Sequence, residues 1–379
     1  MTKPPLPTRA GCIVVGAGLA GAAAAYGLAR RGFSEVLVLE REAVAGVHAS
    51  GRNAAMAFSF IFEPVIRALA RRGRAFLASP PEDFPLPMTN RWTGSVALGS
   101  GPGAARLEAL AAAMRAEGIG VEEWSREELR ARLPVYEPRL GEKAFYCPDD
   151  GVVDVDALLQ GYLRALRRKG GQVRFRCEAL SLISEGGQVS GLVTSEGPVR
   201  TEHVVLAGGP WANELAKEAG LGPLPLGPHR RHLGLVVDGH APPDPAWPLC
   251  WHLTEGFYFR PESGGLLVSA CDEEAMEPAD VGTDPVQVER LARRVTAFLP
   301  GASGARIRRV WAGLRTLTPD QQFVLGPDPR LGGLHWAAGL GGHGVTTSAA
   351  VGEVFAELFT GGSPDFLDAS VLSPARFFI

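Results

Sequence analysis

A glycine-rich turn near the start of the chain restricts the possible fold most strongly. The apolar residues 12–15 predict a short strand, and the alanine-rich residues 22–31 predict a helix. Between them, Gly16 permits a tight turn, Gly18 lets the backbone approach a pyrophosphate, and Gly21 lets the helix lie against the strand. The helix N-terminus presents N–H groups to a negatively charged phosphate. This arrangement predicts a Rossmann-like βαβ unit that binds a dinucleotide.

A second apolar run supports the same interpretation. Residues 36–39 predict a strand that ends at Glu40, 19 residues beyond Gly21. A carboxylate at this spacing is typical of a residue that binds the ribose hydroxyls of a dinucleotide. The same carboxylate would repel the additional phosphate of NADP, so the motif argues against that cofactor.

The segment after Glu40 favours FAD over NAD. It contains small residues and the glycines Gly46 and Gly51, which let the chain pass close to a flat ligand, and it offers donors from Ser50, Arg52 and Asn53 to a phosphate or a ring carbonyl. An FAD enzyme needs such a segment because its longer cofactor continues across the domain. Together with Ala20 of the first helix, we expect cofactor contacts from Arg41, Ala49, Ser50, Gly51, Arg52, Asn53, Ala54, Ala55 and Met56.

Composition limits the class of protein. A chain of 379 residues with 46% hydrophobic content is long enough for about two domains. The net charge of −3 and the mixing of charges give no indication of nucleic-acid binding. No apolar run is long enough for a membrane span, and residues 1–9 do not resemble a signal peptide. Five cysteines without a close pair predict reduced thiols, with no zinc site and no disulfide framework. We expect a cytoplasmic protein, with peripheral association with the inner membrane left open.

The chain resembles the glycine/D-amino-acid oxidase (DAO) family of FAD flavoproteins, and within it the bacterial D-arginine dehydrogenase-like D-amino acid dehydrogenases. The resemblance covers most of the chain: the glycine turn, residues 50–55, 152–170 and 311–315, and the run 341–348. It implies an α/β fold in which a Rossmann-like FAD-binding domain is interleaved with an α+β substrate domain built on a mostly antiparallel sheet.

The chain order predicts how these domains alternate. We expect residues 1–80, 151–220 and 306–379 to form the FAD-binding domain, and residues 81–150 and 221–305 to form the substrate domain. Helices are predicted over residues 104–117, 157–168, 286–298 and 345–359, the second of them capped by Asp154 or Asp156. Strands are predicted over residues 95–98, 172–176, 179–183 and 199–206.

The resemblance also assigns the remaining cofactor contacts. It implies a second approach to FAD at Gly208 and Gly209, which end an apolar strand, and a further contact at Ala179. The glycine run before the last helix is implied to face the flavin ring, where the helix dipole stabilises the negative charge of the reduced ring. This group comprises Gly341, Gly342, His343, Gly344, Val345 and Thr346.

A carboxylate clamp is predicted in the substrate half. The resemblance places Arg231, Tyr258 and Arg315 where the substrate carboxylate is held, and a guanidinium matches a carboxylate with two parallel hydrogen bonds. It places the Gly342 carbonyl near the substrate amine. His343 replaces a tyrosine of the relatives and could line the entrance of the site.

The expected side-chain pocket departs from the relatives that act on arginine. Met56 and Ile61 stand where those relatives have polar residues, and residues 90–95 contain no acid. A buried cationic side chain without a counter-charge is costly, whereas each buried methylene contributes about 0.8 kcal/mol. We therefore expect an amino acid with an apolar side chain. Core packing is the alternative explanation for Met56, Phe58, Phe60 and Ile61.

The expected reaction is oxidative deamination by hydride transfer from Cα to flavin N5. It yields an imino acid, then a 2-oxo acid and ammonia, and the D preference follows from the resemblance alone. Oxidation of a secondary amine (sarcosine, glycine or proline) or of a 2-hydroxy acid remains an alternative, as does a non-catalytic flavin-bound module. We expect non-covalent FAD. None of the lysines, Lys3, Lys143, Lys169 and Lys217, matches an oxygen-activating position, which favours a quinone over dioxygen as acceptor.

Overall fold

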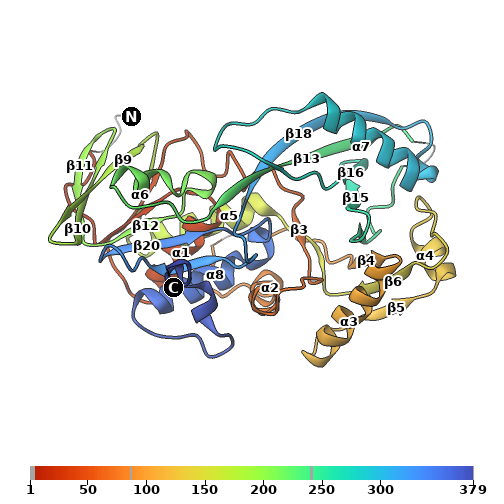
Figure 1. Ribbon diagram of the computed structural model, residues 1–379, viewed down its shortest axis with the longest axis horizontal. Coiled ribbons are helices and arrows are strands. Elements are labelled where there is room, and N and C mark those ends of the chain that lie inside the picture. The colour runs from red at the N-terminus through yellow and green to blue at the C-terminus, as the bar shows by residue number, and fades with distance from the viewer. Residues whose placement is uncertain (1–4, 86–87, 240–241, 379) are drawn as a thin grey trace.

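The computed structural model describes residues 5–85, 88–239 and 242–378 (Figure 1). Two large sheets dominate it, with the six-stranded sheet at the left of Figure 1 and the nine-stranded sheet toward the right. The long strands β13 (Gly227–Val237) and β18 (Arg306–Leu317) run from one region toward the other. The chain therefore has the mixed α/β architecture that the sequence predicts.

The six-stranded sheet is the Rossmann-like part of the fold. Five of its strands are parallel, and one edge strand pairs antiparallel. Its spatial order is β19 (Val324–Pro327), β20 (Leu334–Ala338), β12 (Val204–Leu206), β1 (Cys12–Val15), β2 (Val36–Glu40) and β8 (Gln172–Phe175). The chain enters this sheet in three separate stretches, so the two sheets are interleaved along the sequence.

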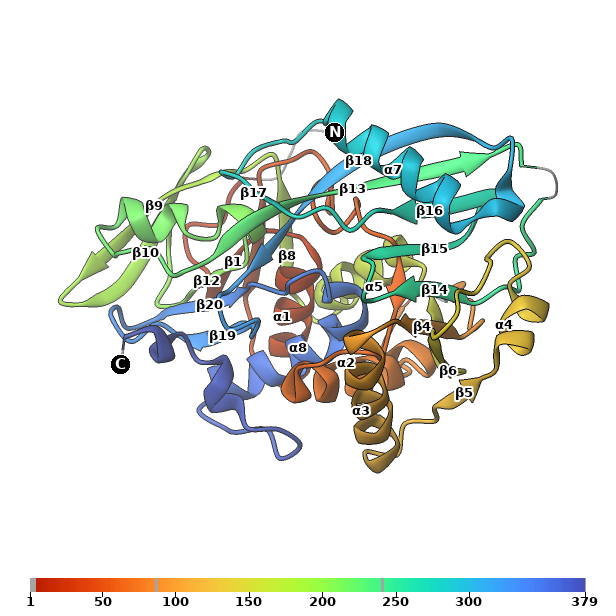
Figure 2. The same cartoon turned by 45° about the vertical axis from the view of Figure 1, so that its right-hand side comes forward.

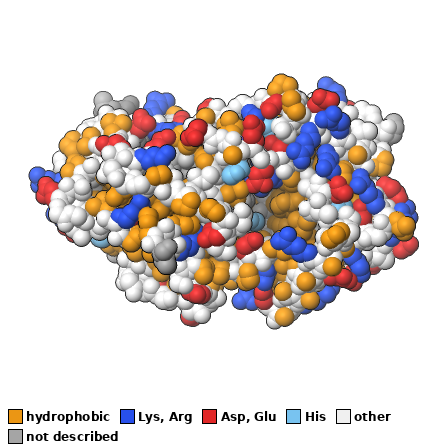
Figure 3. All heavy atoms as spheres, in the orientation of Figure 1, with side chains coloured by type: hydrophobic (Ala, Val, Ile, Leu, Met, Phe, Trp, Pro, Cys, Tyr) orange, Lys and Arg blue, Asp and Glu red, His pale blue; other side chains and the backbone are white. Residues whose placement is uncertain are grey.

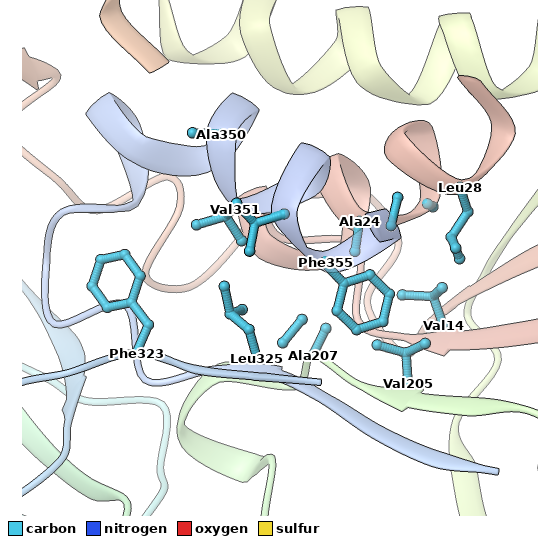
Figure 4. Close-up of a cluster of buried hydrophobic side chains, with 14 of the residues drawn as sticks. Val14, Ala24, Leu28, Val205, Ala207, Phe323, Leu325, Ala350, Val351 and Phe355 are labelled. Carbon is cyan, nitrogen blue, oxygen red and sulfur yellow. The ribbon is translucent and has the colours of Figure 1, made fainter. Parts of the chain in front are cut away.

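The two faces of this sheet pack against different layers, which explains why its strands read as continuous apolar runs. Val14 faces a core formed with helices α1 (Leu19–Arg30) and α8 (Gly344–Phe359), where Figure 4 shows Leu28 and Phe355. Ile13 faces the other way, toward a core shared with Leu192 of a three-stranded sheet. The remaining elements of these layers are α2 (Pro64–Ala78), α5 (Val155–Arg168), α6 (Glu214–Glu218), β9 (Ala179–Glu185), β10 (Gln188–Thr194) and β11 (Gly197–Arg200).

The nine-stranded sheet is antiparallel except where β14 (Leu249–His252) runs parallel to β4 (Ser95–Gly99). Figure 2 shows α7 (Pro285–Phe298) against one part of it and α3 (Pro102–Ala116) against another. Beside β13 and β18, its strands are β17 (Glu274–Ala275), β16 (Gly265–Ser269), β15 (Phe257–Glu262), β14 (Leu249–His252), β4 (Ser95–Gly99), β6 (Lys143–Cys147) and β5 (Glu122–Trp124). Helix α4 (Arg126–Arg132) lies in the same region, and β3 (Met56–Ala57) pairs with β7 (Gly151–Val152) in a small separate sheet.

One expected domain boundary is wrong. The return to the cofactor domain was expected at residue 306, but β18 pairs along its whole length with β13 in the nine-stranded sheet. The pairing runs from Gly227 opposite Leu317 to Val237 opposite Arg306. The chain reaches the six-stranded sheet only at β19, because a long antiparallel ribbon satisfies more backbone groups than an early crossing would.

Candidate functional site

A cavity of about 520 Å³ lies between the two sheets, at the carboxyl ends of the parallel strands. Its lining combines the glycine turn and Glu40 with Arg231, Tyr258 and Arg315 from the nine-stranded sheet. On the face shown in Figure 3, positively and negatively charged side chains are interspersed. The sequence-predicted cofactor and substrate residues therefore belong to one continuous cavity.

The glycine turn forms one part of this cavity as expected. Gly16 has a φ of 106°, a value that L side chains rarely adopt. A Cβ on Gly21 would lie 2.0 Å from the Gly16 carbonyl oxygen, so only glycine lets α1 pack this closely on the turn. Gly18 caps α1 without a side-chain hydrogen bond. The Leu19 N–H donates to the Ser50 hydroxyl, and the next N–H groups of this helix remain for an anion in the cavity.

The Glu40 side chain lines the same part of the cavity. One of its carboxylate oxygens accepts a hydrogen bond from the Ala17 N–H at 2.9 Å, and the other accepts from the Glu42 N–H at 3.0 Å. These two bonds fix the carboxylate at the end of β2. Nearby, the Arg41 guanidinium lies 4.0 Å from the ring centre of Trp211, a lining residue that the cofactor prediction omitted.

The segment after Glu40 is held in place by its own polar side chains. The Ser50 hydroxyl accepts from the Leu19 N–H at 2.9 Å, and the Asn53 side chain accepts from the Ala55 N–H at 2.7 Å. The latter bond supports the left-handed backbone of Ala55, whose φ is 56°. Ser50 and Asn53 therefore shape the loop in addition to lining the cavity.

Arg52 differs from the expectation that it supplies a free donor. It lines the cavity, but its guanidinium donates to the carbonyl oxygens of Val47 and Val281 and pairs with Asp280 at 2.7 Å. A third carbonyl, that of Ala312, lies 3.5 Å away. These bonds join this segment to the nine-stranded sheet. Because they occupy its N–H groups, the Arg52 guanidinium has few donors left for a phosphate.

A second helix N-terminus closes the cavity. Gly341 and Gly342 have φ values of 55° and 92°, and α8 begins two residues later with His343 as an N-cap that makes no side-chain capping bond. A Cβ on Gly342 would lie 2.9 Å from Arg315 Nε. Both this short distance and the positive φ disfavour a side chain at position 342. Burial and the charge of Arg315 lower the pKa of His343 to about 4, which leaves its imidazole neutral near pH 7.

Most of the sequence-predicted residues line this cavity. Gly21 and Gly51 do not, because they act through close backbone packing, and Ile61 does not either. The predicted residues that do line it are Gly16, Gly18, Ala20, Glu40, Arg41, Ala49, Ser50, Arg52, Asn53, Ala54, Ala55, Met56, Ala179, Gly208, Gly209, Arg231, Tyr258, Arg315, Gly341, Gly342, His343, Gly344, Val345 and Thr346.

The register of the nine-stranded sheet brings two arginines to the same wall of the cavity. Arg231 of β13 lies opposite Gly313 of β18, and Arg315 is two residues further along β18. Because side chains alternate along a strand, both guanidinium groups project from the same face. Tyr258 of β15 also lines the cavity, and burial raises the pKa of its phenol. The phenol is thus a hydrogen-bond donor at neutral pH.

These arginines retain donors that no protein group uses. Within the described part of the chain, the Arg315 guanidinium has no hydrogen-bond or ion-pair partner, and Nη1 of the buried Arg231 has none either. Burial, reinforced by the nearby charge of Arg231, lowers the pKa of Arg315. Arg231 is partly paired, since its Nη2 lies 3.6 Å from Glu273, but two positive groups with free donors in one cavity are unfavourable without an anion between them. This wall therefore suits a carboxylate ligand.

Comparison with known proteins decides the family. The model of the family described as FAD dependent oxidoreductase (DAO) matches residues 12–358. The chain belongs to this family. As a member of the DAO family it is an FAD-dependent oxidoreductase, and the architecture described above is the DAO fold.

Two sequence relatives and one solved structure show what the chain is similar to. The chain is 27% identical to 4-methylaminobutanoate oxidase (formaldehyde-forming) of Paenarthrobacter nicotinovorans over 98% of its own length and 46% of that protein. It is 30% identical to D-amino acid dehydrogenase of Paramagnetospirillum magneticum over 65% of its length and 58% of that protein. The crystal structure of L-proline dehydrogenase from P. horikoshii superposes with a TM-score of 0.89 at 22% identity, covering 98% and 99% of the two chains. The chain thus spans about half the length of the two sequence relatives.

The DAO family's cofactor fits the residues present. Beyond Leu19, whose N–H donates to Ser50, the N-terminus of α1 would offer N–H groups to the pyrophosphate, and that of α8 would offer them to the flavin ring. Glu40, which lines the same cavity, would bind the ribose. A side chain at Gly16 or Gly342 would clash with the walls of the cavity. No described helix is long and apolar enough to span a membrane.

The apolar wall of the DAO site differs in part from the prediction. Met56 and Phe58 line the cavity, and the Phe58 ring packs against Trp251 with ring centres 4.9 Å apart and an angle of 35° between the rings. Ile61 instead packs in the core of the six-stranded sheet with Leu69 of α2, because the chain turns after Phe58 to enter that helix. Its assignment to the substrate pocket is therefore wrong, and core packing explains it.

Two lining residues on this wall were missed. Trp251 pairs directly with Tyr258 across the β14–β15 hairpin, and Leu233 lies two residues beyond Arg231 on the same face of β13. The short spacing of the hairpin was the available signal for Trp251. Conversely, Trp92 and Thr93, from the segment compared with the relatives, do not line the cavity.

Glu255 and Glu273, two acids weighed for the substrate end, do not line the cavity. Glu255 pairs with Arg139 and Arg294, away from the cavity lining. Glu273, which directly precedes β17, forms an ion pair with Arg231 Nη2 at 3.6 Å but does not line the cavity. The substrate wall therefore carries net positive charge.

A buried carboxyl group anchors this wall. Asp150 accepts hydrogen bonds from the hydroxyl and N–H of Ser59, which follows Phe58, and from the hydroxyl of Ser95 on β4. Burial raises its pKa to about 6, although these hydrogen bonds oppose the shift. Asp150 thus joins the Phe58 segment to the nine-stranded sheet.

The raised pKa of Asp150 predicts that the free energy of unfolding depends on pH. Its folded pKa of about 6 exceeds the unfolded value of about 3.9, so its stabilising contribution is full below pH 4 and is lost as the pH rises through 6. In the wild type, this group lowers the free energy of unfolding by about 2–3 kcal/mol between pH 4 and pH 8. We expect the Asp150→Asn variant to lack this decrease. Urea denaturation at both pH values measures it, and parallel changes in wild type and variant would contradict the prediction.

Proposed function

We propose that this protein oxidises the Cα–N bond of α-amino acids with apolar side chains, with preference for the D enantiomer. The product is an imino acid, which hydrolyses to a 2-oxo acid and ammonia. The observation that carries the proposal is the free Arg315 guanidinium and the unpartnered Nη1 of Arg231, which lie beside an apolar wall in the FAD-family cavity. The relative named D-amino acid dehydrogenase supports the choice of enantiomer.

The residues of the chain position the substrate. Arg231 and Arg315 hold the carboxylate, with the Tyr258 hydroxyl as a further donor, and the Gly342 carbonyl receives the amine. Met56, Phe58 and Trp251 bury the side chain and exclude water. Bound FAD supplies the chemistry, since its isoalloxazine ring accepts a hydride equivalent from carbon. The N-terminus of α8 stabilises negative charge near that ring.

A secondary-amine substrate is the second candidate. The relative that matches 98% of this chain is named 4-methylaminobutanoate oxidase, whose substrate name contains an N-methyl amine and a carboxylate. The same clamp would hold that carboxylate, and the apolar wall would contact the N-alkyl group instead of a side chain. Sarcosine and proline belong to this class, and glycine, a primary amine without a side chain, and 2-hydroxy acids present the same carboxylate.

An anaerobic substrate panel separates these candidates. We expect D-Leu, D-Met or D-Phe to bleach the 450 nm flavin absorption faster than their L enantiomers, sarcosine, L-proline or D-lactate. All of these ligands carry a carboxylate that the arginines can hold. Differences in their rates of flavin bleaching therefore report their contacts with the apolar wall. If sarcosine or L-proline ranks first, the second candidate replaces the first. If nothing in the panel bleaches the flavin, both candidate functions are wrong, which is the result that a non-catalytic flavin-bound module predicts.

We propose that FAD is held without a covalent bond. The cavity-lining cysteine is Cys177, whose N–H donates to the Glu40 carbonyl at the end of the cavity suited to the ribose. The purified protein is expected to be yellow and to release FAD into the supernatant on acid precipitation. Flavin that stays with the pellet, or NAD in the supernatant, contradicts this.

We also propose a quinone rather than dioxygen as the electron acceptor. Of the described lysines, Lys143 pairs with Glu108 and Glu123, and Lys169 pairs with Asp83, and neither lines the cavity. Lys217 does not line it, and Lys3 lies outside the described residues. Reoxidation of the reduced enzyme by a soluble quinone is expected to exceed reoxidation by air.

A further inference from the structure

A buried histidine–carboxylate pair lies directly behind the clamp. His232 follows Arg231 on β13 and therefore projects from the opposite face of the sheet. The ring Nδ1 of His232 lies 2.6 Å from the carboxylate of Asp272, and the backbone N–H of His232 donates to the same carboxylate at 3.0 Å. Both side chains are at most 2% exposed. Nothing in the proposed chemistry uses this pair, although it adjoins a residue of the clamp.

The hydrogen bonds assign the protonation of the pair. The Asp284 N–H donates to Nε2 of His232 at 2.9 Å, so Nε2 is the acceptor and Nδ1 carries the proton given to Asp272. Burial opposes ionisation of Asp272, but the hydrogen bonds from His232 outweigh it and hold the pKa of this carboxyl below its ordinary value. The pair is thus a neutral imidazole bound to a carboxylate.

The pair fixes the backbone that orients Arg231. The carbonyl oxygen of Asp272 accepts a hydrogen bond from Arg231 Nε at 2.5 Å. The preceding residue, Cys271, has a φ of 46°, a conformation that persists only where its surroundings impose it. With Nε engaged, the free Nη1 of Arg231 is left for a ligand. The direction of the guanidinium therefore depends on the Asp272 segment, which His232 holds at two points.

We propose that His232 and Asp272 are positioning residues, which keep the Arg231 guanidinium aimed at the substrate carboxylate. The inference rests on the proposed carboxylate clamp and adds the residues that make one half of that clamp rigid. Neither residue lines the cavity. Their loss is expected to weaken carboxylate binding while the limiting rate of flavin reduction is unchanged, because the amine and Cα are held by other groups.

Substitutions of His232 test the proposal in the holoenzyme, with benzoate as the probe. Benzoate carries a carboxylate and no amine, and its Kd is read from the change in flavin absorption. His232→Leu removes the donor to Asp272, and the Kd is expected to rise about tenfold. His232→Asn keeps an N–H donor near the position of Nδ1, and its Kd is expected to stay within threefold of wild type. An unchanged Kd in a folded, flavin-loaded His232→Leu variant overturns the proposal.

The Asp272→Asn variant provides a second test, in which the direction of the change in the benzoate Kd decides the outcome. This test keeps the proposal falsifiable if the His232→Leu variant does not fold. Through-space electrostatics alone would tighten benzoate binding, because a negative charge near the clamp is removed. Loss of positioning would weaken it severalfold. Tighter or unchanged binding in this variant therefore overturns the proposal.

A double-mutant cycle separates positioning from general destabilisation. In an Arg231→Met background, His232→Leu is expected to change the Kd no further, since its effect acts through Arg231. Additive effects overturn the inference. If Arg231→Met alone leaves the Kd unchanged, the proposed clamp itself fails, which is a distinct outcome.

The chain also offers a matched control. His252 follows the lining residue Trp251, as His232 follows Arg231, and pairs with the buried Glu142 at 3.2 Å on the same sheet. His252→Leu removes a comparable buried pair that does not contact either arginine. It is expected to lower the melting temperature without raising the benzoate Kd. A similar rise in Kd in this control overturns the assignment of a specific positioning role.

Discussion

Arg315→Met is expected to weaken amino-acid binding by a factor of about 30 or more while leaving FAD bound. Methionine keeps the length and flexibility of the side chain but loses the charge and all the donors. Truncating one partner of a buried charge pair costs roughly 2–5 kcal/mol, because the substrate carboxylate is then left poorly paired. The Kd from anaerobic titration of flavin absorption measures the effect, and the ratio of flavin to protein absorbance monitors the cofactor.

The same strand provides the control for this variant. Arg308 is exposed on β18 and does not line the cavity, so Arg308→Met removes an equal charge from the protein without touching the clamp. Its substrate affinity is expected to match wild type. Equal affinities in all three proteins would show that Arg315 is structural and that the carboxylate is held elsewhere.

The kcat/KM for D-Leu, D-Met or D-Phe is expected to be about a hundredfold higher than that for D-Arg or D-Lys. This ratio corresponds to a difference of at least a few kcal/mol in activation free energy. The wall formed by Met56, Phe58 and Trp251 offers an apolar surface, and the clamp adds positive charge. A cationic side chain would lose its hydration and would meet no carboxylate there. Steady-state assays with a dye acceptor give the ranking.

A pair of substitutions tests whether this wall sets the ranking. Met56→Glu places a carboxylate on the wall and is expected to narrow the gap between D-Leu and D-Arg, whereas Met56→Gln, of similar size but uncharged, is not. If the unmodified enzyme prefers D-Arg, the assignment of the wall is wrong. Glu273, 3.6 Å from Arg231, then becomes the first acid to replace with glutamine.

The parts of the fold that rest on local physics could be predicted from sequence. The first strand, the glycine turn and Glu40 are adjacent in the chain, so their spacing alone predicts a dinucleotide site, and the DAO-family match confirms an FAD-dependent oxidoreductase. The helices predicted over 286–298 and 345–359 agree with α7 and α8 to within one residue at either end. Each has a periodic apolar face and a clear starting signal, Asp284 or a glycine run.

Features that depend on tertiary register could not be predicted in the same way. Ile61 lies five residues from Met56, yet a turn at Ser59 sends it into a different core. The long pairing of β18 with β13 joins residues about eighty positions apart, and no local pattern distinguishes it from a strand of the other sheet. The Asp272–His232 pair is likewise invisible in sequence, because 40 residues separate its members.

The close approach of Gly342 to Arg315 has a consequence for redesign of this enzyme. A single added carbon at 342 would displace the guanidinium, since it would lie 2.9 Å from Nε. The turn before α8 and the carboxylate clamp thus cannot be altered independently. A library intended to change the substrate range should hold both positions constant and diversify Met56, Phe58 and Trp251, where a larger or smaller side chain reshapes the cavity without moving the anchor.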